Sequence, residues 1–94
     1  MRESKIQLDV CAWAREHGIL PIKLTSFASG GWPDYLFLGS QGQVAFIEFK
    51  APNKKPGLRQ ELRIEELRKR GFPVAVVDSY ESGIEFLMHA HMLK

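Results

Sequence analysis

The stretch Val44–Lys50, VAFIEFK, constrains the fold most, because it alternates like a β-strand and yet carries two charges. Successive side chains of a strand point to opposite faces of the sheet. Glu48 and Lys50 are two residues apart, so they share a face, which begins with Val44 and Phe46. The opposite face is entirely apolar, with Ala45, Ile47 and Phe49. The strand is therefore expected to bury one face in a core and to place a carboxylate and an ammonium group together on the other.

A further acidic residue, Asp34, precedes the neighbouring apolar run Tyr35–Leu38 and can meet this charged face across a hairpin. A hairpin loop of five residues, Gly39–Gln43, puts Asp34 opposite Glu48. A loop of four residues puts Asp34 opposite Ile47 instead, on the wrong face unless a bulge corrects the register. The sequence permits both registers and compels neither.

Two carboxylates a few ångströms apart raise each other's pKa unless a cation lies between them. Mg²⁺ and Mn²⁺ prefer carboxylate and carbonyl oxygens together with water. A lysine on the same face can neutralise a phosphate oxygen or orient an attacking water. Two carboxylates, a divalent cation and such a lysine are together the groups that metal-assisted phosphodiester hydrolysis needs. The alternative is an ordinary ion pair of Lys50 with Glu48 or Asp34 on a solvated sheet edge. Spacing alone leaves these two interpretations open.

The remaining sequence predicts an α/β fold with a central mixed sheet flanked by helices, in the order α-β-β-β-α-β-α. Helices are expected from three- and four-residue apolar spacing, and strands from β-branched or alternating runs. The expected helices span Arg2–Gly18, Leu58–Arg70 and Tyr80–His91, and the expected strands Leu20–Leu24, Tyr35–Leu38, Val44–Lys50 and Phe72–Asp78. Residues 1–94 contain no repeat or linker, so we expect one domain.

Charge and cysteine content narrow the function classes. The formal net charge is only +2, but residues 54–70 hold seven Lys or Arg against three Glu, a local charge of +4. The single cysteine, Cys11, excludes an internal disulfide and a multi-cysteine zinc site, and we expect it to be a small core residue. No run is apolar enough to span a bilayer, and the first residues do not resemble a signal peptide. These features predict a cytoplasmic protein with one positive side.

The motif GGWPD, Gly30–Asp34, followed by IEFK, Ile47–Lys50, resembles the signature of the virus-type replication-repair nuclease domain (VRR-NUC). This family is a branch of the PD-(D/E)xK nuclease superfamily, and its fold is restriction-endonuclease-like. The resemblance covers almost the whole chain: an N-terminal helix with Glu3, a basic loop, a helix with Gln60, and a strand after an RGF turn. A chain of this size is similar to the stand-alone phage and bacterial type.

The resemblance implies a role for each matching residue. Asp34, Glu48 and the backbone carbonyl of Phe49 would bind Mg²⁺ or Mn²⁺, and Lys50 would be the catalytic lysine. Glu3 would bind a second metal or a metal-bound water, and it shares the core-facing stripe of its helix. Taken without the resemblance, Glu3 is a first-turn glutamate favoured by the helix dipole. Gln60 shares a stripe with apolar residues and would reach the region of Lys50 or the phosphate.

Candidate DNA contacts surround the same end of the expected sheet. Lys54, Lys55 and Arg59 are candidate phosphate contacts, and Gly31 leaves room for the DNA backbone. Trp32 can stack on a base or pack, and the sequence leaves both open. A second basic group is expected to form a solvated helix face balanced by glutamates: Arg63, Arg68 and Lys69 against Glu61, Glu65 and Glu66. No role is assigned to His17, His89 or His91.

The resemblance implies a metal-dependent, structure-specific DNA endonuclease, of the kind that resolves Holliday junctions as a homodimer in DNA repair. Two symmetric nicks at a four-way junction need two active sites related by a two-fold axis. The last helix carries more apolar residues than one stripe requires, and some of them can form the dimer face. The alternatives are a nuclease of the same family acting on flaps, nicks or single strands, a non-catalytic DNA-binding module, and a small restriction-type enzyme. The expected location is the cytoplasm of a bacterium or of a phage-infected host.

Overall fold

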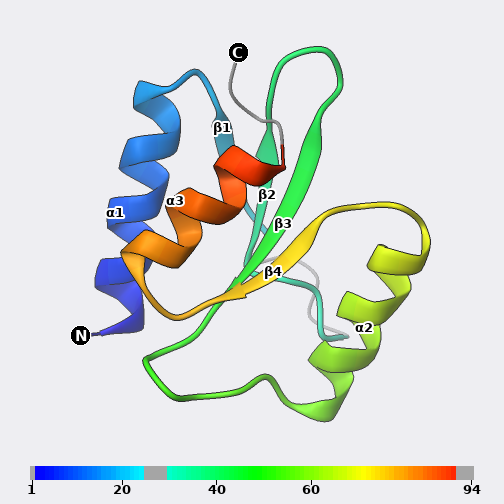
Figure 1. Ribbon diagram of the computed structural model, residues 1–94. Helices are drawn as coiled ribbons and strands as arrows, with labels where there is room; N and C mark the ends of the chain where they lie inside the picture. Colours follow the sequence, from blue (N-terminus) through cyan, green and yellow to red (C-terminus); the bar gives the residue numbers. More distant parts are fainter. Residues whose placement is uncertain (1, 25–29, 91–94) are drawn as a thin grey trace.

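The computed structural model describes residues 2–24 and 30–90 and contains three helices and four strands in the order expected from the sequence (Figure 1). In chain order they are α1 (Glu3–Glu16), β1 (Leu20–Lys23), β2 (Tyr35–Leu38), β3 (Val44–Phe49), α2 (Leu58–Lys69), β4 (Val74–Val77) and α3 (Tyr80–His89). Several elements are one to three residues shorter at their ends than the expected ranges, and His91 lies outside the described residues.

The sheet is mixed, as expected, with the strand order β1-β2-β3-β4. The first three strands are antiparallel, and β4 runs parallel to β3. Tyr35 lies opposite Ile47 and Leu38 opposite Val44, which leaves the five residues 39–43 as the hairpin loop. The loop is closed by a hydrogen bond of 2.9 Å from the Gly39 N–H to the Gln43 carbonyl. Continued by one residue, this register places Asp34 opposite Glu48, so the five-residue alternative is confirmed.

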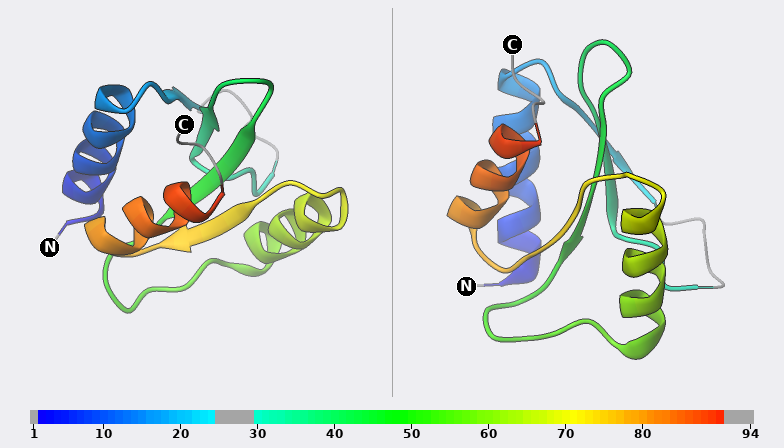
Figure 2. Two further views of the ribbon diagram at one scale, coloured as in Figure 1. Left: turned by 45° about the horizontal axis from the view of Figure 1, so that its top comes forward. Right: turned by 45° about the vertical axis from the view of Figure 1, so that its right-hand side comes forward.

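The two faces of the sheet are covered by different helices (Figures 1 and 2). Helices α1 and α3 lie side by side on one face, over a core that includes Phe37, Ala45, Ile47 and Phe49. Cys11 belongs to this core, as expected. Helix α2 lies on the other face, where Phe46 and Val74 pack against Ile64 and Leu67. The predicted division of β3 into two faces is confirmed, because Phe46 and Phe49 lie in different clusters.

Helices α1 and α3 approach each other closely because Gly83 of α3 lacks a side chain. A Cβ at that position would lie 2.7 Å from Cγ2 of Val10, closer than carbon atoms pack. Ser79 caps α3, and its hydroxyl accepts the Ser82 N–H at 3.1 Å.

Strand β1 forms one edge of the sheet, and its outward edge is poorly suited to pairing with another strand. The Leu24 N–H donates to the Asp34 carbonyl at 2.8 Å, so alternate residues of β1 turn their backbone groups toward β2. The backbone groups of Pro21 and Lys23 therefore point outward. Proline has no N–H to donate, and lysine and proline are residues that protect sheet edges against aggregation. Among the described residues, no helix is long and apolar enough to cross a membrane.

Candidate active site

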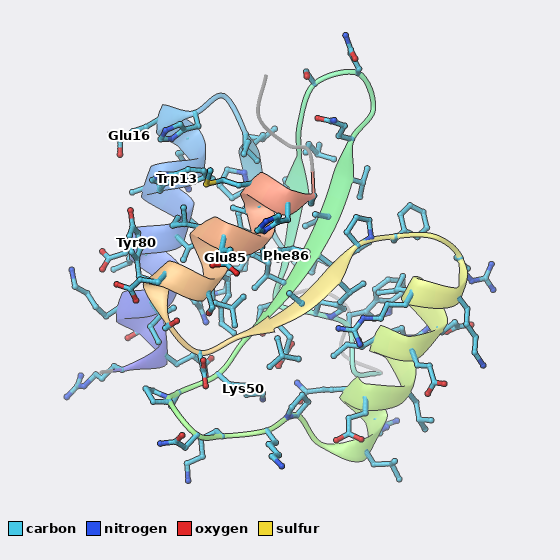
Figure 3. The ribbon with its side chains drawn as sticks, viewed as in Figure 1. Trp13, Glu16, Lys50, Tyr80, Glu85 and Phe86 are labelled. Atoms are coloured by element: carbon cyan, nitrogen blue, oxygen red, sulfur yellow. The ribbon has the colours of Figure 1, made fainter. Side chains whose placement is uncertain are left out.

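The residues of the GGWPD and IEFK motifs meet at one end of the sheet. The end of β3, the N-terminus of α1 and the beginning of α2 all lie at this end, which is the lower end in Figure 1. Figure 3 shows Lys50 there, where β3 passes into the loop that leads to α2. Side chains from four separate segments are thus brought to one place by the sheet register and by the loop 50–57.

Asp34 is held from two sides at the point where the β2–β3 pairing ends. Its Oδ2 atom accepts the backbone N–H of Phe49 at 2.8 Å, and its own carbonyl accepts the N–H of Leu24. The preceding Pro33 is fully buried, which fixes the approach to Asp34. The side chain of Phe49 lies in the core, as its alternation with Glu48 predicts.

Glu48 is a buried carboxylate with two unequal oxygen atoms. Only 1% of the residue is exposed. Its Oε2 atom accepts a hydrogen bond of 2.6 Å from Nε2 of Gln60 and pairs with Nζ of Lys50 at 3.1 Å. Its Oε1 atom is buried without a hydrogen-bond partner among the described residues. Because a buried unpaired oxygen is costly, this atom is a candidate to bind a cation or a water.

Lys50 differs from an ordinary surface lysine. Its side chain is only 21% exposed, and its ammonium group is held by Glu48. Its N–H donates to the carbonyl of Val77 at 2.9 Å, which fixes the backbone although β3 ends at Phe49. The alternative interpretation, an ordinary ion pair of Lys50, is thus met in part, because Lys50 does pair with Glu48. The pair lies at the end of a central strand with a buried carboxylate, however, and not on a solvated sheet edge.

The two carboxylates are electrostatically coupled. Burial raises the pKa of Asp34, and the negative charge of Glu3 raises it further, against the lowering effect of the Phe49 N–H. Burial also raises the pKa of Glu48, as does the charge of Asp34, and Lys50 opposes both effects. One lysine thus does not compensate the negative charge that gathers here, and a divalent cation would do so.

Gln60 has two partners that explain its position in the third residue of α2. Its Oε1 atom accepts the N–H of Gly57 at 3.1 Å, which satisfies a free donor at the start of the helix. Its Nε2 atom donates to Glu48. The sequence places Gln60 near Lys50 or the phosphate, and the structure shows that its direct contact is the carboxylate that also holds Lys50.

Glu3 lies close enough to influence the site through its charge but not within a metal-binding cluster. It is half-buried, and its carboxylate accepts a hydrogen bond of 3.1 Å from Gln7. Across residues 2–24 and 30–90, no three His, Cys, Asp or Glu side chains converge as metal ligands. The role of Glu3 at a second metal or a metal-bound water remains a prediction.

The donor set at this end of the sheet fits Mg²⁺ or Mn²⁺. Glu48 offers a buried oxygen that has no partner in the described part of the chain, and Asp34 lies opposite it with a raised pKa. Hard divalent cations bound by one or two carboxylates usually complete their coordination with carbonyl oxygens and water. Two protein carboxylates are therefore sufficient for such a site.

The segment Gly30–Pro33 packs on α2 and is not an open loop. Gly31 has a φ of +77°, and a Cβ there would lie 2.5 Å from the carbonyl oxygen of Arg59. Trp32 packs against the cluster under α2, and the guanidinium of Arg63 lies 4.6 Å from the centre of its ring. Packing, one of the two alternatives left open for Trp32, is thus observed, while a contact with DNA stays a prediction.

The expected solvated face that includes Arg63 and Arg68 is present only in part, because Arg68 is exposed and Arg63 is half-buried but both also bond to backbone carbonyls of other segments. Arg63 pairs with Glu66 but also donates to the carbonyl of Gly30 at 3.4 Å. Arg68 donates to the carbonyl of Val74 from both Nε and Nη2, at 3.2 and 2.8 Å. Lys69 fits the expectation, as an exposed partner of Glu65 at 3.9 Å.

Comparison with known proteins identifies the class to which this arrangement belongs. The family model of the VRR-NUC domain matches residues 3–81, so the chain belongs to the VRR-NUC family of nuclease domains. A solved structure described as a VRR-NUC domain superposes with a TM-score of 0.83 and 32% identity, covering 93% of this chain and 95% of that one. A second, described as a VRR-NUC domain protein, has a TM-score of 0.72 at 22% identity, over 94% of this chain and 86% of that chain, and bears on the fold alone.

A phage protein is also similar over most of its length. It is named "Putative nuclease p44", from Acyrthosiphon pisum secondary endosymbiont phage 1, and is 33% identical over 84 residues. The aligned part covers 86% of this chain and 87% of the phage protein. The family and this relative both support a nuclease.

Replacing Glu48 by glutamine should stabilise the metal-free protein at neutral pH. Folding raises the pKa of the Glu48 carboxyl, so the protonated carboxyl stabilises the native state at pH values below its pKa in the unfolded chain. This stabilisation is lost as the pH rises through the pKa of the carboxyl in the folded protein. We therefore expect the free energy of unfolding of Glu48→Gln to exceed that of the wild type by an amount that grows from about pH 4.3 toward neutrality. Urea unfolding in EDTA at several pH values measures this difference. A difference that is independent of pH, or that shrinks as the pH rises, would contradict the raised pKa.

Proposed function

We propose that residues 1–94 form one domain of a Mg²⁺- or Mn²⁺-dependent DNA endonuclease that cuts branched DNA, in the manner of a homodimeric Holliday-junction resolvase. The observation that supports it best is the buried Glu48. One of its oxygens holds Lys50 and Gln60, and the other, on the face shared with Asp34, has no partner within residues 2–24 and 30–90.

In this proposal each residue of the site has one task. Asp34, Glu48 and the carbonyl of Phe49 bind the metal, which when bound makes a coordinated water more acidic and stabilises charge on the phosphate. Lys50, oriented by Glu48, contacts the scissile phosphate or the attacking water through its ammonium group. Gln60 keeps the Glu48 carboxylate oriented so that its free oxygen faces the metal. Glu3 acts through a second metal or a metal-bound water.

The DNA is proposed to approach over the loop between β3 and α2. Lys54 and Lys55 of this loop and Arg59 at the start of α2 are exposed and follow Lys50 closely in the chain. Phosphate contacts from such residues give affinity without sequence information. Contacts of this kind favour recognition of DNA shape over recognition of sequence.

A homodimer would supply the two active sites that a four-way junction needs. On α3, Leu87 is buried in the core, whereas Met88 is 53% exposed beside Tyr80 and Ile84 in a shallow hollow. Figure 3 shows Tyr80 and Glu85 on this helix, away from Lys50. A dimer formed through α3 would leave both active sites accessible, and we propose this surface as the interface. The proposed location is the cytoplasm of a bacterium or of a phage-infected host.

A panel of DNA substrates tests the proposal. A four-way junction, a flap, a nicked duplex, an intact duplex and a single strand are incubated with the protein in Mg²⁺, Mn²⁺ or EDTA. We expect paired symmetric incisions in the junction with either metal and no cleavage in EDTA. Cleavage that persists in EDTA would contradict the metal mechanism, and preferential cutting of the flap, nick or single strand would replace the resolvase by a nuclease for those structures. Binding without cleavage would indicate a DNA-binding module, and sequence-dependent cutting of the duplex a restriction-type enzyme.

A further inference from the structure

Arg63 joins α2 to the segment that leads into Asp34. Its Nη1 atom pairs with Oε1 of Glu66 at 3.0 Å, which anchors the guanidinium on its own helix. Its Nη2 atom donates to the carbonyl of Gly30 at 3.4 Å, and its Cζ atom lies 4.6 Å from the centre of the Trp32 ring. The planar guanidinium suits this combination, because it can stack on an aromatic ring and donate in its own plane at the same time.

The chain from these contacts to the carboxylate is short and stiff. Gly31, between the two residues that Arg63 contacts, lies against the backbone of Arg59. Pro33, the next residue after Trp32, is buried and has a fixed φ. Asp34 follows directly. A displacement of Gly30 and Trp32 would therefore pass to the backbone of Asp34 with little to absorb it.

Helix α2 also contacts the second carboxylate, that of Glu48. Gln60 lies one turn before Arg63 on α2 and donates to Oε2 of Glu48. Helix α2 thus holds Glu48 through Gln60 and the approach to Asp34 through Arg63. Asp34 is also tied to the sheet by the N–H groups of Phe49 and Leu24. Helix α2 adds a common support for the two carboxylates through its contacts with Glu48 and Gly30.

We propose that Arg63 is a positioning residue of the metal site: it fixes the segment Gly30–Pro33 on α2 and thereby sets the position of Asp34 relative to Glu48. This inference rests on the proposed function, since it takes Asp34 and Glu48 as metal ligands. Arg63 itself touches neither metal nor substrate in this account. Groups that orient metal ligands typically change metal affinity by a factor of about 10 to 100 when they are removed.

Mn²⁺ affinity, measured by calorimetry or by the loss of the free Mn²⁺ signal in electron paramagnetic resonance, tests the proposal without any cleavage assay. We expect Arg63→Ala to weaken Mn²⁺ binding about tenfold at a temperature at which the variant is folded. Arg63→Lys should recover part of this loss, because lysine keeps the cation but not the planar fork. Arg63→Lys also serves as the test variant if Arg63→Ala does not fold.

Arg70→Ala is the matched control. Arg70 is an arginine near the end of the same helix and pairs with the same residue, Glu66, at 3.5 Å. Its removal should leave Mn²⁺ affinity within about twofold of the wild type, a change too small to count as loss of a ligand-orienting group. Equal Mn²⁺ affinities of Arg63→Ala and Arg70→Ala, with only the melting temperature lowered in Arg63→Ala, would show a merely structural role and overturn the inference.

A separate variant distinguishes failure of this inference from failure of the proposed function. Asp34→Asn removes a proposed ligand, so it should abolish most Mn²⁺ binding. If Asp34→Asn binds Mn²⁺ as tightly as the wild type, the proposed metal site is wrong, and the proposed role of Arg63 is overturned as well. If Asp34→Asn loses binding and Arg63→Ala does not, the metal site stands and the role of Arg63 alone is overturned.

Discussion

Lys50→Ala is expected to lower the rate of DNA cleavage by about a hundredfold to a thousandfold, which is the cost of removing one preorganised group that stabilises transition-state charge. Lys50 is suited to this role because Glu48 fixes its ammonium group at 3.1 Å while part of the side chain stays exposed. The loss should fall on the rate of the bound complex, with a small change in DNA affinity. Single-turnover cleavage at saturating protein, with the fold checked by circular dichroism, measures it.

Two lysines elsewhere provide controls for this result. Lys54→Ala removes a proposed phosphate contact, so it should weaken DNA binding and reduce its salt dependence, with the saturated cleavage rate preserved. Lys69→Ala removes an exposed charge whose partner, Glu65, lies on the same helix, so it should have little effect. A cleavage rate of Lys50→Ala within a few-fold of the wild type would contradict the catalytic role of Lys50.

Gly31→Ala is expected to have the largest effect on stability. The backbone at Gly31 has a φ of +77°, which costs an L-residue about 1–2 kcal/mol, and its Cβ would lie 2.5 Å from the Arg59 carbonyl oxygen. Overpacking against a backbone atom adds about 1–3 kcal/mol. A total of about 3 kcal/mol would lower the melting temperature by roughly 12–24 °C for a chain of this size. Thermal unfolding followed by circular dichroism gives the value directly.

Gly42→Ala separates the two contributions. Gly42 in the β2–β3 loop has the same φ, +77°, but a Cβ there would meet no atom within 4 Å. Its substitution should therefore cost only the conformational part, about 1–2 kcal/mol. If Gly31→Ala is no more destabilising than Gly42→Ala, the segment Gly30–Pro33 does not pack on α2 as described.

The faces of β3 could be predicted from the sequence because side-chain alternation in a strand is strict. Glu48 and Lys50 had to share a face, and Phe49 had to enter the opposite core. The register with β2 could not be decided, since it depends on the length of the hairpin loop. The structure has Gln41 and Gly42 both at positive φ in a five-residue loop, and residue types alone do not select this conformation over a shorter turn.

The partners of Arg63 and Arg68 were beyond prediction from helix periodicity alone. Both residues have glutamates at favourable spacing on α2, which is also the pattern of a solvated helix. Their actual partners include backbone carbonyls of Gly30 and Val74, which belong to other segments. Backbone carbonyls leave no trace in the sequence, so contacts of this kind follow only from the packing of α2 on the sheet.

Anomalous diffraction from crystals grown with Mn²⁺ tests the central claim most directly, because it locates the metal independently of cleavage. The account predicts a Mn²⁺ peak bonded to Asp34 and to Oε1 of Glu48, the oxygen that is buried without a partner among the described residues. The same peak should be absent from crystals of Asp34→Asn. A Mn²⁺ ion bound elsewhere, with Asp34 and Glu48 not coordinated to it, would contradict the proposed active site.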